Sequence, residues 1–191
     1  MKRILLLAAV AVGVFSFVPV SVTGSVYVVT QGMGTVAMPM TEVKIYDAAE
    51  FSKALEAKKV DYLTHCSHLP SADYMQELEL RALKGGPEAV SQYAEYRDKI
   101  EACSTVTFVS SAEYLTPIET VTTDKNGEFQ FKVNRYKDVV VMADGKRAVG
   151  LGEETYVWLK KYEPSISSFS ARLELNNHNE ISNTTMVDLS I

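Results

Sequence analysis

The chain has 191 residues, of which 47% are hydrophobic, and its 19 basic and 24 acidic residues give a formal net charge of −5. Ten glycines and six prolines are too few for a collagen-like or low-complexity chain, and the apolar content is too high for a disordered acidic one. The mildly acidic balance argues against a nucleic-acid partner, because contact with a phosphate backbone requires clustered positive charge.

The first 24 residues have the layout of a secretory signal peptide. Lys2 and Arg3 form a short cationic segment, and residues 4–22 carry no charge. Cleavage is expected before Ser25, with an earlier site after Ser16 as the alternative. An uncleaved membrane anchor is a further alternative, because an uncharged run of this length just spans a bilayer. We therefore expect a secreted or periplasmic protein, with membrane contact only through an uncleaved signal; loss of the two basic residues makes its net charge −7.

Two strands and then a helical segment are predicted after the signal. Residues 25–30 are β-branched and aromatic, and residues 42–46 alternate polar with apolar. Helical spacing begins at Asp47, which forms a capping-box-like pattern with Glu50. The helical segment predicted from these patterns covers residues 47–104.

The second half of this helical segment is expected to be a helical hairpin. Ser71 is a predicted helix start, and Pro87 suits the first turn of the next helix. The break between the two helices, Gly85-Gly86, is short, so the helices should run antiparallel.

Strand patterns return after the helices. Residues 117–123 lead into the turn sequence Asp124-Lys125-Asn126-Gly127, and residues 128–133 alternate without a fault, so a β-hairpin is predicted here. Further strands are predicted at residues 139–143, 154–162, 172–175 and 186–191. Seven or eight strands separated by turns indicate a mainly β fold, a β-sandwich with the helical segment inserted after its second strand.

Three segments share a pattern with a known family. They are Gly24–Thr30, Thr122–Phe129, which contains a T-D-x-x-G-x-F turn, and Val139–Ala143, a strand that ends in alanine. This combination resembles the carboxypeptidase regulatory-like family, in particular secreted bacterial proteins of that type. The resemblance implies a transthyretin-like (prealbumin-like) β-sandwich of about seven strands over residues 25–191, outside the helical insertion 47–104.

The two cysteines are predicted to form a disulfide. Cys66 precedes the second helix and Cys103 ends the third, so an antiparallel hairpin brings them together. In an oxidising compartment such cysteines pair, and closing a loop of roughly 38 residues stabilises the fold by about 4 kcal/mol. A redox or metal-binding thiol pair is the alternative, but the Cys-x-x-Cys spacing that favours it is absent.

Metal binding and catalysis find little support in the sequence. His65 and His68 are weak metal candidates, because residues within so short a run rarely point at one centre and Cys66 is assigned to the disulfide. There is no Gly-x-Ser-x-Gly, His-Glu-x-x-His or Gly-rich phosphate-binding sequence. We therefore expect a non-enzymatic protein without cofactor or metal; the alternative function is a small hydrolase or metal-binding protein that uses His65, His68 and His178.

Aromatic side chains supply the candidate binding surface. Tyr156 and Trp158 share one face of a predicted strand, as a sugar- or peptide-stacking platform or, alternatively, as part of the core. Tyr93 and Tyr96 lie on the apolar stripe of the third helix. Insertions on a rigid scaffold usually carry the specific function, so the sequence predicts an exported binding or scaffolding module of the cell envelope that takes a protein, peptide or carbohydrate ligand. The helical insertion is its candidate partner surface; the alternative is that the insertion only covers one face of the sheet.

Overall fold

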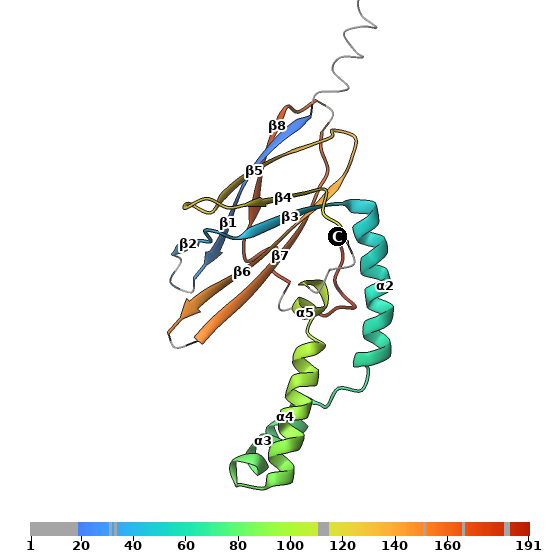
Figure 1. Cartoon of the computed structure of the whole chain (residues 1–191), viewed down its shortest axis with the longest axis vertical. Helices are drawn as coiled ribbons and strands as arrows, with labels where there is room; N and C mark the ends of the chain where they lie inside the picture. Colours follow the sequence, from blue (N-terminus) through green and yellow to red (C-terminus); the bar gives the residue numbers. More distant parts are fainter. Residues whose placement is uncertain are drawn as a thin grey trace, which may run out of the picture. The chain divides into compact units, whose positions relative to one another are not determined.

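The computed structural model describes residues 19–30, 32, 34–110, 115–150, 152–165, 167–181 and 184–191 (Figure 1). These residues form two compact units. The first contains the described residues of 1–52 and 115–181 together with Ile191, and the second contains those of 53–114 and 182–190. Residues 1–18, most of the predicted signal peptide, lie outside the described residues. Of the helices within the described ranges, none is both long and apolar enough to cross a membrane.

The first unit is a β-sandwich of two four-stranded sheets, which confirms the mainly β fold class. In the first sheet, β1 is central. It pairs in parallel with β8 and antiparallel with β2 and β5. The strands of this sheet are β1 (Val20–Val29), β2 (Thr35–Ala37), β5 (Glu128–Val133) and β8 (Ser170–Leu175). The second sheet has the order β4-β3-β6-β7 and consists of β3 (Glu42–Asp47), β4 (Glu119–Thr122), β6 (Val139–Val149) and β7 (Gly152–Tyr162).

The central strand β1 begins earlier than its sequence pattern predicts. The predicted start at Ser25 is wrong, because the strand already begins at Val20, and Val20 and Val22 are fully buried. The strand-like alternation of buried and more exposed residues was not recognised here, because its first residues lie within the apolar run assigned to the signal peptide. A boundary after Gly24 divides the central strand in two, whereas the alternative cleavage after Ser16 leaves it whole.

The core lies between the inner faces of the two sheets. Phe129, Phe131 and Val133 face inward on β5, and Trp158 from β7 is fully buried opposite them in the same cluster. The Phe129 ring lies over Gly24, its cross-strand partner: a Cβ on Gly24 would approach the ring Cζ to 2.3 Å. A single glycine thus makes room for an aromatic ring in the middle of β1.

The outer faces of the two sheets differ in character. On the second sheet part of the outer face is apolar and buried, and Phe51 packs there on Tyr46, with ring centroids 5.4 Å apart. The other buried apolar side chains of this face are Val140, Met142, Val157 and Leu159. On the first sheet the outward-facing positions are mostly polar and exposed. The outer face of the second sheet is therefore partly buried, and that of the first sheet is open to solvent.

The turn at residues 124–127 forms as predicted, but it does not join a β-hairpin. Asp124 Oδ1 accepts hydrogen bonds from the backbone N–H groups of Asn126 at 2.8 Å and Glu128 at 2.9 Å, and Gly127 has a φ of +75°. The strands on either side enter different sheets, since β4 pairs with β3 and β5 pairs with β1. The hairpin prediction is wrong because a turn sequence specifies the reversal of the chain and not the partner of each strand.

The hairpin that the structure does contain joins β6 and β7, which pair along their full length from Val139↔Tyr162 to Val149↔Gly152. The sequence predicted only residues 139–143 of β6, because the charged segment that follows shows no alternation. Cross-strand ion pairs hold this exposed part, with Lys146 Nζ 2.9 Å from Glu153 Oε1.

The helices begin where the sequence predicts. They are α2 (Ala48–Cys66), α3 (Ala72–Leu83), α4 (Pro87–Ala102) and α5 (Thr105–Ser110), the last of which was not predicted. Asp47 Oδ1 accepts hydrogen bonds from the N–H groups of Ala49 and Glu50 and so caps α2. Ser71 Oγ accepts one from the N–H of Tyr74 at the start of α3. Side-chain capping of free N–H groups thus explains these two helix starts.

The predicted last strand, residues 186–191, is not a strand. The Thr185 carbonyl accepts hydrogen bonds from the N–H groups of Asp188 and Leu189, and its hydroxyl bonds the Asp188 side chain. Met186 and Leu189 are both buried, which is the three-residue spacing of a helical turn and not the alternation of a strand. A hydroxyl that bonds nearby backbone competed here with sheet pairing.

Candidate functional site

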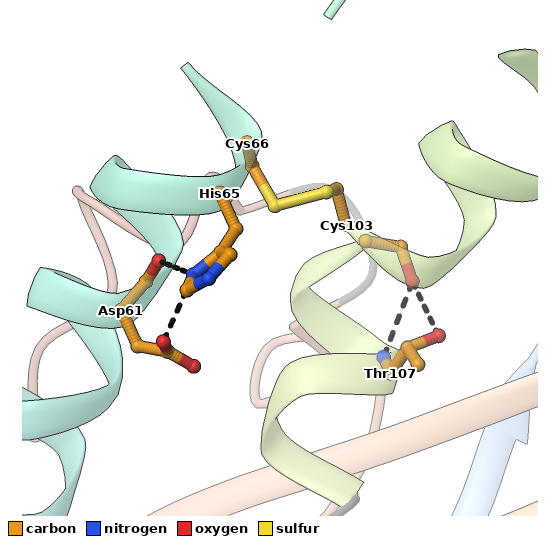
Figure 2. The surroundings of a disulfide bond; sticks show 6 residues. Asp61, His65, Cys66, Cys103 and Thr107 are labelled. Atoms are coloured by element: carbon orange, nitrogen blue, oxygen red, sulfur yellow. Dashed lines mark hydrogen bonds and ion pairs between the residues drawn. A yellow bond between two sulfur atoms is a disulfide. The ribbon is translucent and has the colours of Figure 1, made fainter. Parts of the chain in front are cut away.

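The disulfide predicted between Cys66 and Cys103 is confirmed (Figure 2). The two Cα atoms are 5.8 Å apart, and the bond joins the last residue of α2 to the residue that follows α4. Both cysteines are buried. Directly after Cys103, Ser104 Oγ accepts a hydrogen bond from the N–H of Thr107 at 3.1 Å and so caps the start of α5. The disulfide thus restrains both ends of the α3–α4 hairpin.

The histidines beside and beyond this disulfide do not form a metal site with it. His65 Nδ1 lies 3.0 Å from both the backbone oxygen and the Oδ1 atom of Asp61, one turn earlier in the same helix (Figure 2). Cys66 is consumed by the disulfide, and His68 is exposed in the turn after α2. His178 is exposed in a turn of the sandwich unit. Within the described ranges, no three His, Cys, Asp or Glu side chains are grouped to hold a metal ion.

An apolar groove runs between α3 and α4. Its volume is about 470 Å³, and it is lined mainly by carbon atoms, with Met75 on one wall and Tyr93 and Ile100 on the other. The loop before α3 contributes Leu69 and Pro70 to one end. The lining residues follow helical spacing on each helix, so each wall is one face of a helix. Tyr93 was a candidate binding residue from the sequence, whereas Met75 was not.

The helical hairpin buries few side chains for its length. Within α3 only Leu78 is fully buried, and within α4 no residue is. Tyr96 is half-buried and its ring meets that of Tyr74 edge to face, with centroids 6.0 Å apart, so it belongs to the packing between the helices and does not line the groove. Several large apolar side chains of this hairpin remain exposed: Leu80, Leu83, Val90 and Ile100. Of these, Ile100 also lines the groove, and a contiguous exposed apolar surface is typical of a contact site for a partner.

Tyr156 and Trp158 lie in the sandwich core and do not form an open platform. Their rings stack with centroids 5.5 Å apart and planes 9° apart, but Trp158 is fully buried and Tyr156 is 8% exposed. Stacking on a ligand requires a free ring face, and neither ring has one in this structure. The arrangement is the core alternative that the sequence left open.

A polar network closes the outer end of this aromatic pair. The Tyr156 hydroxyl donates to the Glu154 carboxylate, which also accepts from Arg147 at 2.8 Å. These two donors lower the pKa of Glu154, the tyrosine hydroxyl being the larger influence. Burial and the bond to Glu154 raise the pKa of Tyr156. Neither shift points to proton transfer, because the groups are satisfied by one another.

No protein-family model matches this chain. No curated protein matches its sequence either. Among solved structures, a Pseudomonas aeruginosa protein provisionally described as carbohydrate-binding aligns over 85% of this chain and 90% of its own, with 12% identity and a TM-score of 0.41. The pilus backbone of Streptococcus pneumoniae aligns over 82% of this chain but only 41% of its own, with 8% identity and a TM-score of 0.22. Likenesses this low carry no argument about a ligand, and the carboxypeptidase regulatory-like resemblance stays a prediction.

Proposed function

We propose that the chain is a non-catalytic, exported binding or scaffolding module of the cell envelope, and that it docks a protein partner in the groove between α3 and α4. The observation that carries this proposal is the groove itself, apolar and about 470 Å³ in volume, on a hairpin that buries almost none of its own side chains. Two packed helices cannot enclose a core, whereas a third helix laid along their groove completes a bundle.

The lining pattern favours a helix as the occupant. Ala72, Met75 and Glu79 follow one another along α3 at steps of three and four, and Tyr93, Arg97 and Ile100 do so along α4. Two such parallel stripes accept a third stripe of the same periodicity, as in ridge-and-groove packing.

The charge of the hairpin favours a basic partner. The two helices carry seven acidic residues against three basic ones. Glu79 and Arg97 stand at the groove itself, and the other acidic residues lie elsewhere on the two helices. A partner helix with one apolar face and lysines or arginines along its flanks therefore matches the apolar groove and the net negative charge of the hairpin.

The disulfide supports the same function by holding the groove in shape. The loop that contributes Leu69 and Pro70 follows Cys66 directly, and Cys103 follows the helix that forms the other wall. A groove fixed in advance loses less conformational entropy on binding than a flexible one.

The proposal is tested with two synthetic helical peptides of equal length, one built from leucine and lysine and the other from leucine and glutamate. By fluorescence anisotropy, the basic peptide should bind at least about tenfold more tightly. Ile100→Asp, which places a charge on the groove wall, should weaken this binding about tenfold or more. Val60→Asp is the matched control, because Val60 is a 65% exposed position of α2 that does not line the groove.

Equal binding of the two peptides, or equal binding to Ile100→Asp and Val60→Asp, contradicts the proposal. Absence of any binding by the basic peptide does so too. Photo-crosslinking from position 93 in exporting cells then identifies the natural partner, which should contain a basic amphipathic helix.

A further inference from the structure

The open face of the first sheet carries a polar trough centred on β1. The register of the sheet places β1 between β5 and β8, so its outward side chains are flanked on both sides. Along β1 these side chains are short and hydroxylated: Ser21, Thr23 and Ser25. The flanking side chains are mostly long. A row of short side chains between rows of long ones forms a channel, because strands in a sheet are only about 4.8 Å apart.

Each step along the trough combines a hydroxyl with charged or amide groups. Thr23 lies between Gln130 on β5 and Arg172 on β8, and Ser25 lies between Glu128 and Glu174. A hollow of about 470 Å³ opens at the Thr23 step, lined there by Gln130, Arg172 and Glu128, with Asp124 from the neighbouring turn and Thr122 from β4. Hydrogen-bond donors and acceptors thus lie together around Thr23, whereas both groups beside Ser25 are acceptors.

Several of these side chains are held in place before any ligand arrives. Gln130 Nε2 donates to Ser21 Oγ at 3.0 Å, and Thr23 Oγ1 donates to the Ala171 carbonyl at 3.3 Å. At the end of the trough, the Tyr27 hydroxyl donates to Glu174 Oε2 at 2.8 Å and accepts from Asn176. Fixed polar groups reduce the entropy lost on binding.

The outer faces of the two sheets differ in polarity. The second sheet buries apolar side chains on its outer face, such as Met142 and Val157, beside the polar Lys44. The trough also lacks the positive charge that a polyanion requires, because Asp124, Glu128 and Glu174 outnumber Arg172 and Lys132.

From these observations we infer that the trough binds a neutral oligosaccharide. A sugar hydroxyl both donates and accepts, so it matches a surface on which carboxylates accept, an arginine and an amide donate, and serine and threonine hydroxyls do either. Successive sugar rings extended along β1 place such hydroxyls against each step of the trough. This site lies on the sandwich unit and is independent of the helical groove.

The test titrates the full exported chain with cellotetraose, maltotetraose and chitotetraose, and with heparin as a polyanion. At least one neutral tetrasaccharide should bind with a Kd of about 1 mM or lower by calorimetry. NMR shifts should change on the outward residues of β1, β5 and β8. Arg172→Ala and Thr23→Val should each weaken binding about tenfold. Arg81→Ala, an exposed arginine of α3 outside the trough, should leave it unchanged.

Failure of all three tetrasaccharides to bind overturns the inference, and so does binding of heparin alone. Binding that survives both Arg172→Ala and Thr23→Val places the sugar elsewhere and equally overturns it. Thr23→Val keeps the shape and β-propensity of the side chain, so a loss of affinity there reports the hydroxyl and not a loss of folding. The outcome is separate from that of the peptide experiment, because the substitutions lie on different units.

Discussion

The sandwich and the helical hairpin hold themselves together in different ways. Among the described residues, the sandwich has a continuous core of 17 buried residues shared between its two sheets. The hairpin of α3 and α4 has one fully buried side chain, Leu78, and is restrained at its ends by the Cys66–Cys103 disulfide. The first depends on burial within the chain, and the second on a covalent bond.

This difference shows which apolar side chains remain available to bind a partner. In the sandwich nearly all large apolar side chains on the inner faces are used in folding, so little remains for a ligand except polar groups on an outer face. In the hairpin the disulfide replaces part of the stabilisation that a core provides. Side chains such as Tyr93 and Ile100 are therefore not needed for packing within the hairpin and are available to contact a partner.

The largest expected effect comes from breaking the sandwich at its first strand. A chain that starts at Ser25 lacks residues 20–24, which pair with both β5 and β8. It should fail to fold, whereas a chain that starts at Phe17 should unfold cooperatively on heating. Circular dichroism compares the two, and mass spectrometry of the exported protein should place its N-terminus before Pro19. A stable fold of the shorter chain contradicts the assignment of β1 as the central strand.

The next largest effect is expected in the helical unit. Replacing both cysteines, Cys66→Ser with Cys103→Ser, removes a bond across 37 positions of sequence and should destabilise this unit by about 4 kcal/mol. Hydrogen exchange of α3 and α4 should become fast, while that of the core strands β1 and β6 stays slow. Equal acceleration in both units shows instead that they unfold together, and the contrast between them is then lost.

A smaller effect sharpens the role of close packing in the sandwich. Gly24→Ala places a methyl group 2.3 Å from the Phe129 ring and should cost about 1–3 kcal/mol in denaturant unfolding. In a Phe129→Leu background the same substitution should cost less, because the crowding atom is gone. Gly152→Ala is the control: its nearest neighbour would be 3.8 Å away, and the change should stay within about 0.5 kcal/mol. Equal costs of Gly24→Ala in both backgrounds contradict the contact.

The smallest effect concerns the polar network near the start of β7, around Glu154. Because the folded-state pKa of Glu154 lies below its ordinary value, the carboxylate contributes stability above that value and loses it as the pH falls through the lowered pKa. Tyr156→Phe removes the main donor, so the carboxyl pKa, followed by carbon-13 NMR, should rise toward its ordinary value. Arg147→Ala should raise it less. A larger rise with Arg147→Ala reverses the order of the two influences.

The sequence predicted those elements whose signal is local. Asp47 and Ser71 cap helices through their own side chains, and Asp124 and Gly127 form a turn by themselves. The cysteine pairing followed from the hairpin and the parity of two cysteines. The predictions failed where distant partners decide the outcome. β4 pairs with β3 and β5 pairs with β1, and neither partner is specified by the turn between β4 and β5. The start of β1 depends on burial by strands that lie far along the chain.

The candidate sites follow the same division. Tyr93 was found from helical spacing, but Met75 has the same spacing whether it packs inside the hairpin or lines the groove. The burial of Trp158 and the trough beside Thr23 depend on the assembled sheets, in particular on the placement of β8 next to β1. No local sequence pattern predicts that β8 lies next to β1.

The parallel pairing of β1 with β8 also sets an order in time. Ser21 pairs with Ser170, which lies about 150 residues later in the chain, so the sheet is complete only after β8 has been made. Contacts between residues so distant in sequence form slowly. The neighbouring helices α3 and α4 need only each other and a short turn. During synthesis the hairpin therefore forms early, and the two cysteines can meet while β1 still lacks its partners β5 and β8. Until the last strand emerges, one edge of β1 stays unpaired, and an unpaired strand edge is prone to aggregation.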